Sequence, residues 1–478
     1  MAPYASAESK SIRKCQEFPM HHPSRPRMRR GRAVLAVTTA GMLLALSGCA
    51  GAGELASGGD TLRVLMVNNP QMAELRKLTA EHFTAKTGIK VDFTVLPEND
   101  VRDKISQDFA NQAGQYDVAT LSNYETPVYA KNEWLRSLDP YIKKDKRFDQ
   151  KDILPPVRES LSGEDGQVYA EPFYGESSFL MYRKDVFAEE GLKMPAHPTW
   201  QQVAELAAKA DGSRKGMKGI CLRGLPGWGE LIAPLTSMVN TFGGTWFDKD
   251  WKARLQDPEF VKATKFYVKL VREHGQAGAA QSGYAECLNN MTQGKSAMWY
   301  DATAGAGSLE AAKSPVRGKI GYVPAPVERT KQSGWLYTWA WGIQKASPNP
   351  DKAWKFISWA SGKEYERLVG REFGWANVPA GKRASTYELP EYKKQAGDFG
   401  EVTKQAIAGA KPRDPGVQER PAIGIQFVGI PEFADLGTKV SQEISAAIAG
   451  RQSVDSALRK SQKLASEISE DYEGRDRQ

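Results

Sequence analysis

The sequence predicts an α/β fold with a parallel sheet, and two observations support this prediction. A strand pattern, a helical pattern and a second strand pattern follow one another over residues 61–95, which is the order of a βαβ unit. The 478 residues are 41% hydrophobic and 26% charged and contain no long low-complexity tract, which excludes a disordered, collagen-like or multi-span membrane protein. A chain of this length buries a sizeable core without disulfides.

The individual elements follow from hydrophobic periodicity. Strand patterns occupy 61–67, 89–95 and 116–121, with shorter strand-like runs at 219–222, 297–300 and 335–342. Helical spacing of apolar residues marks 71–87, 101–111, 258–273, 433–448 and 453–468. Ligands of open α/β sheets bind at the carboxyl ends of strands. The polar residues at those ends are 68–69, 97–99 and 122–125.

The first 48 residues have the features of an export signal. They carry a net charge of +6, and the remainder of the chain carries +2. The basic stretch 25–32 precedes an apolar run over 33–46, which is shorter than the roughly 20 residues of a membrane span. We expect translation to start at Met28, and the pair Arg29-Arg30 leaves the Sec and twin-arginine routes open.

The apolar run ends in Leu46-Ser47-Gly48-Cys49, which resembles the lipobox of bacterial lipoproteins. The resemblance implies cleavage before Cys49 and lipid on its sulfur. Residues 49–59 are small and rich in Gly and Ser, which predicts a lipidated tether. We therefore expect an extracytoplasmic protein, anchored by lipid to the outer face of the cell membrane.

Cysteine usage and charge limit the partners further. An exported chain with Cys221 and Cys287 favours a disulfide between them, and two separate buried thiols are the alternative. Neither a CxxC motif nor a Cys/His cluster occurs, so we expect no metal and no cofactor. The near-neutral body lacks the charge that a phosphate backbone would require, so we expect no nucleic-acid partner.

Several segments together resemble the extracellular solute-binding proteins, family 1, of carbohydrate ABC importers. Besides the lipobox they are 83–91, 116–118, 172–185, 293–303 and 347–356. Segments 172–185, 223–230 and 295–303 are similar to the branch that binds sugar alcohols such as sorbitol and mannitol. The resemblance covers essentially all of 60–472.

This resemblance implies a two-lobed, periplasmic-binding-protein-like fold with a mixed sheet flanked by helices in each lobe. Three crossing segments are expected near 170–175, 298–304 and 337–343. The first lobe would hold 60–170 plus 304–337, and the second 175–298 plus 343–472. The implied function is capture of a sugar alcohol or other small carbohydrate between closing lobes and delivery to an ABC permease. We expect a monomer that binds without turnover.

Aromatic residues alternate along 335–342. If this segment is extended, Trp335, Tyr337, Trp339 and Trp341 share one face. Sugars present apolar C–H patches that lie flat on aromatic rings. These four rings are therefore candidate ligand contacts, with ordinary core packing as the alternative for each.

Charged side chains are the second group of candidates, because hydrogen bonds to charged partners are the stronger ones. Asp301 and Arg223 follow strand-like runs, with a structural ion pair as the alternative. Glu176 follows a predicted crossing and could instead order the hinge. The remaining candidates are Asn68, Tyr124, Tyr174, Trp228 and Trp375.

An exported carbohydrate-active hydrolase that uses a carboxylate pair is the alternative function. No catalytic residue is predicted. Gly294-Lys295-Ser296 lacks the earlier glycine of a phosphate-binding loop, because position 289 is Asn289. The chain contains no Gly-x-Ser-x-Gly motif, and its histidines after Cys49 are too dispersed for a triad.

Overall fold

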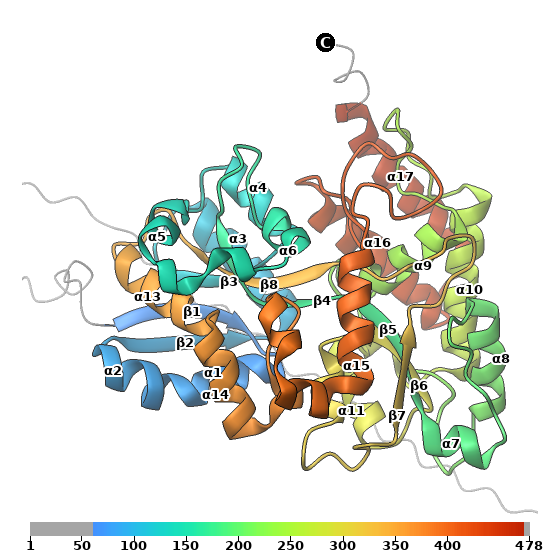
Figure 1. Cartoon of the computed structure of the whole chain (residues 1–478). Coiled ribbons are helices and arrows are strands. Elements are labelled where there is room, and N and C mark those ends of the chain that lie inside the picture. The colour runs from blue at the N-terminus through green and yellow to red at the C-terminus, as the bar shows by residue number, and fades with distance from the viewer. Residues whose placement is uncertain (1–60, 473–478) are drawn as a thin grey trace, which may run out of the picture. The chain divides into compact units, whose positions relative to one another are not determined.

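The structure, a computed structural model, describes residues 61–472 (Figure 1). The predicted export signal 1–48 and the whole lipidated tether 49–59, with the lipidation site Cys49, lie outside the described residues. Two sheets organise the described part of the chain. We call the elements packed on the five-stranded sheet the first lobe and those packed on the three-stranded sheet the second lobe.

The first sheet confirms the predicted βαβ unit. Its strand order is β2-β1-β3-β8-β4, with β1 parallel to β2 and β3, and β8 antiparallel to β3 and β4. The sheet is therefore mixed. Its strands are β1 (Thr61–Val67), β2 (Lys90–Leu96), β3 (Val118–Ser122), β4 (Ala170–Glu176) and β8 (Tyr337–Ile343).

Helices cover this sheet. The predicted helix over 71–87 is present and contains one π-helical turn, and Gly88 ends it with a φ of +73°, a left-handed conformation that favours glycine. The first-lobe helices are α1 (Pro70–Leu78), η1 (Thr79–Thr84), α2 (Ala85–Thr87), α3 (Glu98–Ala110), α4 (Glu125–Lys131), α5 (Asp139–Lys144), η2 (Lys146–Phe148), η3 (Gln150–Asp152), α6 (Pro155–Ser160), α13 (Pro350–Ala360) and α14 (Lys363–Phe373).

The second sheet has the order β6-β5-β7, and both outer strands are antiparallel to β5. Cys221 forms an isolated parallel bridge with Trp299 of β6. Because this bridge is parallel, the second sheet is also mixed. Its strands are β5 (Ser178–Arg183), β6 (Met298–Ala302) and β7 (Ile320–Pro324). The predicted disulfide is confirmed, because Cys221 is bonded to Cys287 with their Cα atoms 5.6 Å apart.

The second lobe is mainly helical around this small sheet. Ser453 begins the last helix as predicted, since its Oγ accepts from the N–H of Ser456 at 3.1 Å. The elements are α7 (Lys184–Glu189), α8 (Trp200–Ala210), α9 (Ile232–Phe242), α10 (Pro258–His274), η4 (Ala279–Gln281), α11 (Tyr284–Thr292), α12 (Gly305–Leu309), η5 (Trp375–Asn377), η6 (Ala384–Glu388), α15 (Pro390–Gly409), α16 (Phe433–Ile448) and α17 (Val454–Tyr472).

Strand pairing changes the division of the chain that was predicted. The predicted first lobe includes 304–337, whereas β7 pairs with β5 in the second sheet, where it covers an edge that would otherwise be open. The predicted crossing at 298–304 is therefore absent, because β6 and β7 flank the same strand. The predicted second lobe includes 343–472, whereas Phe356 of α13 packs on Trp341 of the first sheet, with ring centroids 5.6 Å apart.

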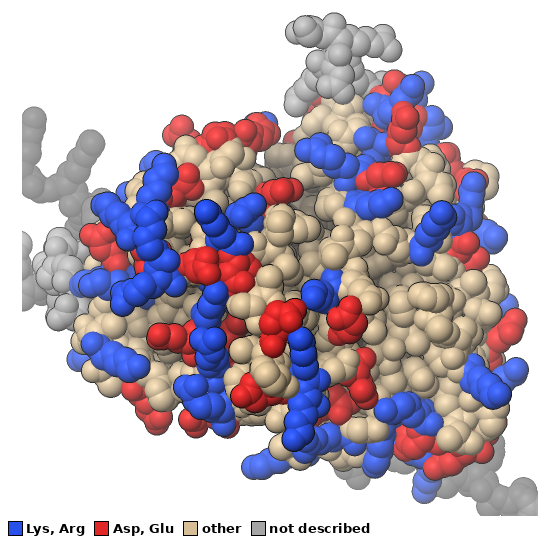
Figure 2. Space-filling view, in the orientation of Figure 1, with Lys and Arg blue, Asp and Glu red and all other residues tan. Residues whose placement is uncertain are grey.

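The chain changes sheets directly after β4, between β7 and β8, and between α14 and α15. The first of these places lies close to the predicted crossing at 170–175. The surface carries both signs of charge, and Figure 2 shows basic and acidic side chains intermixed on the face in view. Within 61–472, no helix combines the length and apolar character needed to cross a membrane.

Candidate ligand-binding site

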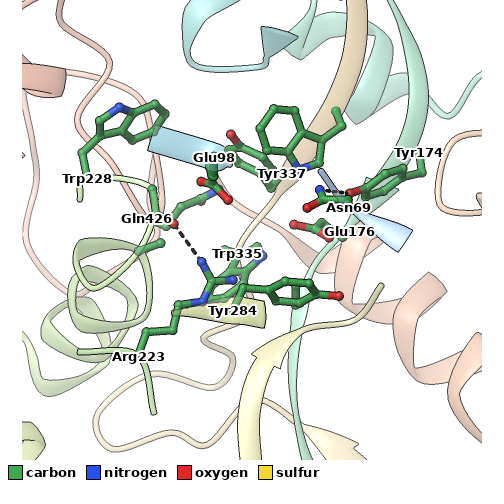
Figure 3. A pocket seen from close by; sticks show the side chains of 14 residues that line it. Asn69, Glu98, Tyr174, Glu176, Arg223, Trp228, Tyr284, Trp335, Tyr337 and Gln426 are labelled. Carbon is green, nitrogen blue, oxygen red and sulfur yellow. Dashed lines mark hydrogen bonds between the residues drawn. The ribbon is translucent and has the colours of Figure 1, made fainter. Parts of the chain in front are cut away.

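A cavity is lined by residues of both lobes (Figure 3). The first lobe contributes the ends of β1 and β2, where α1 and α3 begin, together with β4 and β8. The second lobe contributes one residue each of α9, α11 and β6 and five residues that lie outside helices and strands. The lining residues are Asn69, Glu98, Tyr174, Glu176, Arg223, Trp228, Gly229, Ala233, Tyr284, Ala302, Trp335, Tyr337, Trp339 and Gln426.

Aromatic rings form much of the wall. Tyr337 and Trp339 project from the same face of β8, and their ring centroids lie 5.6 Å apart at 77°. Trp335 and Trp228 line the cavity from the second lobe. Such rings present flat apolar surface to C–H groups, so this wall suits a molecule with a carbon backbone.

Arg223 is held by a fixed set of partners. Its Nε and Nη2 donate to the two carboxylate oxygens of Asp301 at 2.9 and 2.5 Å. Its Nη1 donates to the carbonyl of Gly229 at 2.8 Å and to Glu230 at 3.3 Å. Of the five guanidinium N–H groups, these bonds leave one on Nη2 for a ligand. The positive charge is thus offset by carboxylates before any ligand binds.

Two of the lining residues carry buried polar atoms without a hydrogen-bond partner. The indole N–H of Trp335 and the side-chain oxygen of Gln426 have no hydrogen-bond partner among the described residues, although both side chains are buried. Buried polar groups are normally paired, so one donor and one acceptor await a partner here. A hydroxyl group, which both donates and accepts, satisfies either atom.

Glu176 on β4 adds a carboxyl group to the cavity. Burial raises its pKa well above the usual value, while the charge of Arg223 acts in the opposite direction. A carboxyl group protonated in this way carries no charge and donates a hydrogen bond. Glu176 therefore adds hydrogen-bonding capacity without making the cavity strongly anionic.

The structure brings together many of the predicted site residues. Those that line the cavity are Tyr174, Glu176, Arg223, Trp228, Trp335, Tyr337 and Trp339. Asp301 lies behind Arg223, and its carboxylate is fully buried and also accepts from the indole of Trp299 at 3.0 Å. Asp301 and Arg223 therefore form the structural ion pair that was the alternative interpretation of these two residues.

Four other predicted residues lie away from this cavity. Trp341 packs on Phe173 in the first-lobe core, because it lies farther along β8 than the lining residues. Asn68 is exposed, while its neighbour Asn69 lines the cavity.

Tyr124 lies behind Trp228, with ring centroids 4.5 Å apart. Its hydroxyl donates to the carbonyl of Ile430 at 3.0 Å. Trp375 belongs to η5, and its ring packs closely on Gly370 of α14. A Cβ atom at Gly370 would lie 2.6 Å from the Trp375 ring. Both rings therefore support neighbouring elements and do not form the cavity wall.

Sequence reasoning missed several lining residues. Asn69 and Glu98 lie within the strand ends 68–69 and 97–99, where ligand binding was expected. Their position at the carboxyl ends of strands could therefore have identified them. Gly229 and Ala302 lie within the segments that carry the resemblance. Tyr284, Ala233 and Gln426 belong to no motif, and only the tertiary fold brings them to the cavity. Within 61–472, no group of three or more His, Cys, Asp or Glu side chains is placed to hold a metal ion.

The model of the family "Bacterial extracellular solute-binding protein" matches residues 68–367. The chain belongs to this family. The solute-binding protein is 39% identical over 406 residues to a protein of Pseudomonas aeruginosa described as a mannitol-binding protein, covering 84% of this chain and 92% of that one. The resemblance to the sugar-alcohol branch is thereby confirmed.

Two solved structures extend the comparison. A solute-binding protein of Agrobacterium vitis with bound D-mannitol is 43% identical, with a TM-score of 0.84, covering 86% of this chain and 98% of that one. A solute-binding protein of Agrobacterium radiobacter in complex with ribitol is 26% identical, with a TM-score of 0.76, covering 86% and 99%. The predicted two-lobed fold is confirmed by these neighbours.

Proposed function

We propose that this solute-binding protein captures a sugar alcohol, with mannitol as the first candidate, and delivers it unaltered to the permease of an ABC importer. The observation that carries the proposal is the cavity itself. It combines aromatic walls with an unpartnered donor on Trp335 and an unpartnered acceptor on Gln426. An alditol consists of a carbon chain with hydroxyl groups, which matches both features. The mannitol-bound neighbour supports the same choice.

The charge of the cavity favours a neutral ligand over a phosphate ester or sugar acid. Arg223 already has two carboxylate partners. Glu98 adds a further acidic side chain to the wall. An anion needs cations that are still unpaired. We therefore expect anionic solutes to bind at least tenfold more weakly than alditols, where tenfold is about 1.4 kcal/mol.

The cellular arrangement is part of the same proposal. Cys49 carries the lipid that anchors the protein to the outer face of the cell membrane, and a monomer works with the transmembrane subunits of the permease. Cys49→Ser is expected to leave ligand affinity unchanged and to release the protein from membranes. Membrane fractionation of cells that express each form measures this, and an unreleased Cys49→Ser protein would contradict the anchor.

Calorimetric titration of the purified protein tests which ligand it binds. Mannitol, sorbitol, ribitol, maltose and glycerol 3-phosphate form the panel, and chromatography of the recovered mannitol checks that it is unchanged. We expect binding of hexitols without any product. Binding of maltose but of no alditol would refute the sugar-alcohol assignment, and conversion of a chromogenic glycoside would favour the hydrolase alternative.

A further inference from the structure

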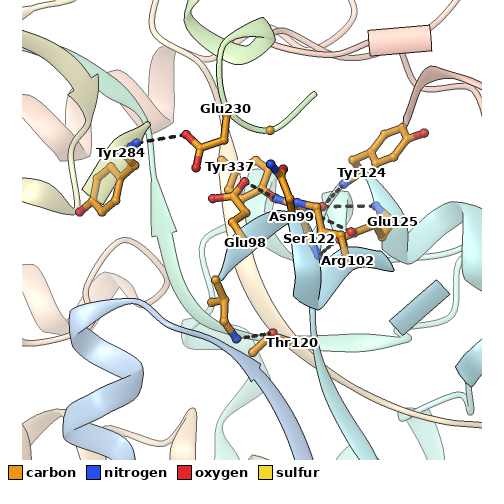
Figure 4. Close-up of polar contacts among 12 residues, drawn as sticks. Glu98, Asn99, Arg102, Thr120, Ser122, Tyr124, Glu125, Glu230, Tyr284 and Tyr337 are labelled. Atoms are coloured by element: carbon orange, nitrogen blue, oxygen red, sulfur yellow. Dashed lines mark hydrogen bonds and ion pairs between the residues drawn. The ribbon is translucent and has the colours of Figure 1, made fainter. Parts of the chain in front are cut away.

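Arg102 of α3 lies next to the cavity without lining it. Its side chain is buried, and its Nη1 donates to Glu125 at 2.7 Å while Nη2 donates to Glu98 at 2.9 Å (Figure 4). The hydroxyl of Tyr337 is a third partner. Two carboxylates offset the cost of burying the guanidinium charge. All of these partners belong to the first lobe.

The faces of the same guanidinium contact rings from both lobes. Its carbon lies 4.1 Å from the ring centroid of Trp228 in the second lobe and 4.8 Å from that of Trp339 in the first. Cation–π attraction is strongest where the charge is withdrawn from water. Contact with Trp228 exists only while the lobes meet at this point.

The surrounding contact between the lobes is close. The side-chain amide of Asn99, also on α3, donates to the carbonyl of Pro226 at 3.1 Å. A Cβ at Gly229 would lie 2.3 Å from the Glu98 carboxylate and 3.1 Å from Nη2 of Arg102. The first turn of α3 therefore packs closely on loop 226–229, and a side chain at Gly229 would require the side chains of Glu98 and Arg102 to move.

We propose that Arg102 is a positioning residue that couples lobe closure to assembly of the ligand site. It contacts four residues of the cavity wall, which are Glu98, Trp228, Tyr337 and Trp339. Closure brings Trp228 onto a cation that the first lobe already holds in place, and the wall is then complete. This inference rests on the proposed function, because it concerns retention of the sugar alcohol.

The test is a double-mutant cycle on the dissociation rate of mannitol, followed by stopped-flow tryptophan fluorescence. Arg102→Lys keeps the charge but loses the planar group that lies against both indoles. We expect about 10- to 30-fold faster release, the range that corresponds to one buried cation–π contact. In a Trp228→Leu background, the same substitution should change the rate less than about threefold, because the shared contact is already gone.

Arg63→Lys is the matched control, since Arg63 lies in the first lobe and pairs with Asp117 away from the cavity. Its release rate should equal that of the wild type. An equal effect of Arg102→Lys in both backgrounds would assign Arg102 to support of the first lobe alone and overturn the proposal. Unchanged release in Arg102→Lys would overturn it as well. Failure of the wild type to bind any alditol would instead refute the proposed function, and the inference with it.

Discussion

Replacement of Asp301 by Asn tests how the ligand site is supported. Asp301 is fully buried and accepts two hydrogen bonds from Arg223, which is only 5% exposed, so the pair is shielded from solvent. Asparagine has nearly the same shape but no charge, and its amide N–H₂ would face the guanidinium on one side. The substitution leaves Glu230, at 3.3 Å, as the remaining acidic partner of Arg223, and burial raises the pKa of that carboxyl group to about 8.

The expected loss of stability follows from this burial. Removing one partner of a buried ion pair costs about 3–5 kcal/mol, because the other charge stays buried without compensation. The remaining contact with Glu230 places Asp301→Asn near the lower end of that range. Mannitol affinity should fall too, since Arg223 no longer holds its position in the cavity wall. Both effects are expected, because Asp301 acts through Arg223.

Urea unfolding followed by circular dichroism, together with calorimetric titration, measures both effects. Asp211→Asn is the control in the same lobe. Asp211 pairs with the 41%-exposed side chain of Lys218, and its loss should cost at most about 1 kcal/mol. An Asp301→Asn protein as stable as this control would refute the argument that the pair is structurally important. Reduced affinity at unchanged stability would assign Asp301 directly to the ligand.

Three further predictions concern single features of the fold. Burial raises the pKa of Glu171 to about 8, so the folded state holds a proton that the unfolded state releases above its usual pKa. Unfolding free energy should thus fall between about pH 4.5 and 8 by up to about 1.4 kcal/mol per pH unit, and Glu171→Gln should flatten this urea-derived profile. Replacing Cys221 and Cys287 together by Ser should cost about 4 kcal/mol in urea unfolding, because their bond closes a long loop; a loss below 1 kcal/mol would contradict this. Trp335→Phe should weaken mannitol binding about tenfold in calorimetry by removing the indole donor, and unchanged affinity would show that this donor does not reach the ligand.

Local features of the sequence predicted much of the fold. The βαβ unit, the helix that Gly88 ends and the helix that Ser453 begins depend on residues near one another in the chain. The placement of β7 was missed because the sequence does not say which strand edge it covers, and that edge belongs to β5. Pairing between distant strands is decided by the sheet as a whole.

The candidate site divides in the same way. Alternation along β8 by itself determined that Tyr337, Trp339 and Trp341 share a face, because side chains of a strand point to opposite sides in turn. Only the tertiary structure decided which of these rings meets the cavity, since the helix α13 covers Trp341. The sequence likewise determined the kinds of side chain available for a sugar alcohol. Only the packing of the two lobes places Gln426 and Tyr284 in the cavity wall, because the wall is built from residues that are close in space and far apart in the chain.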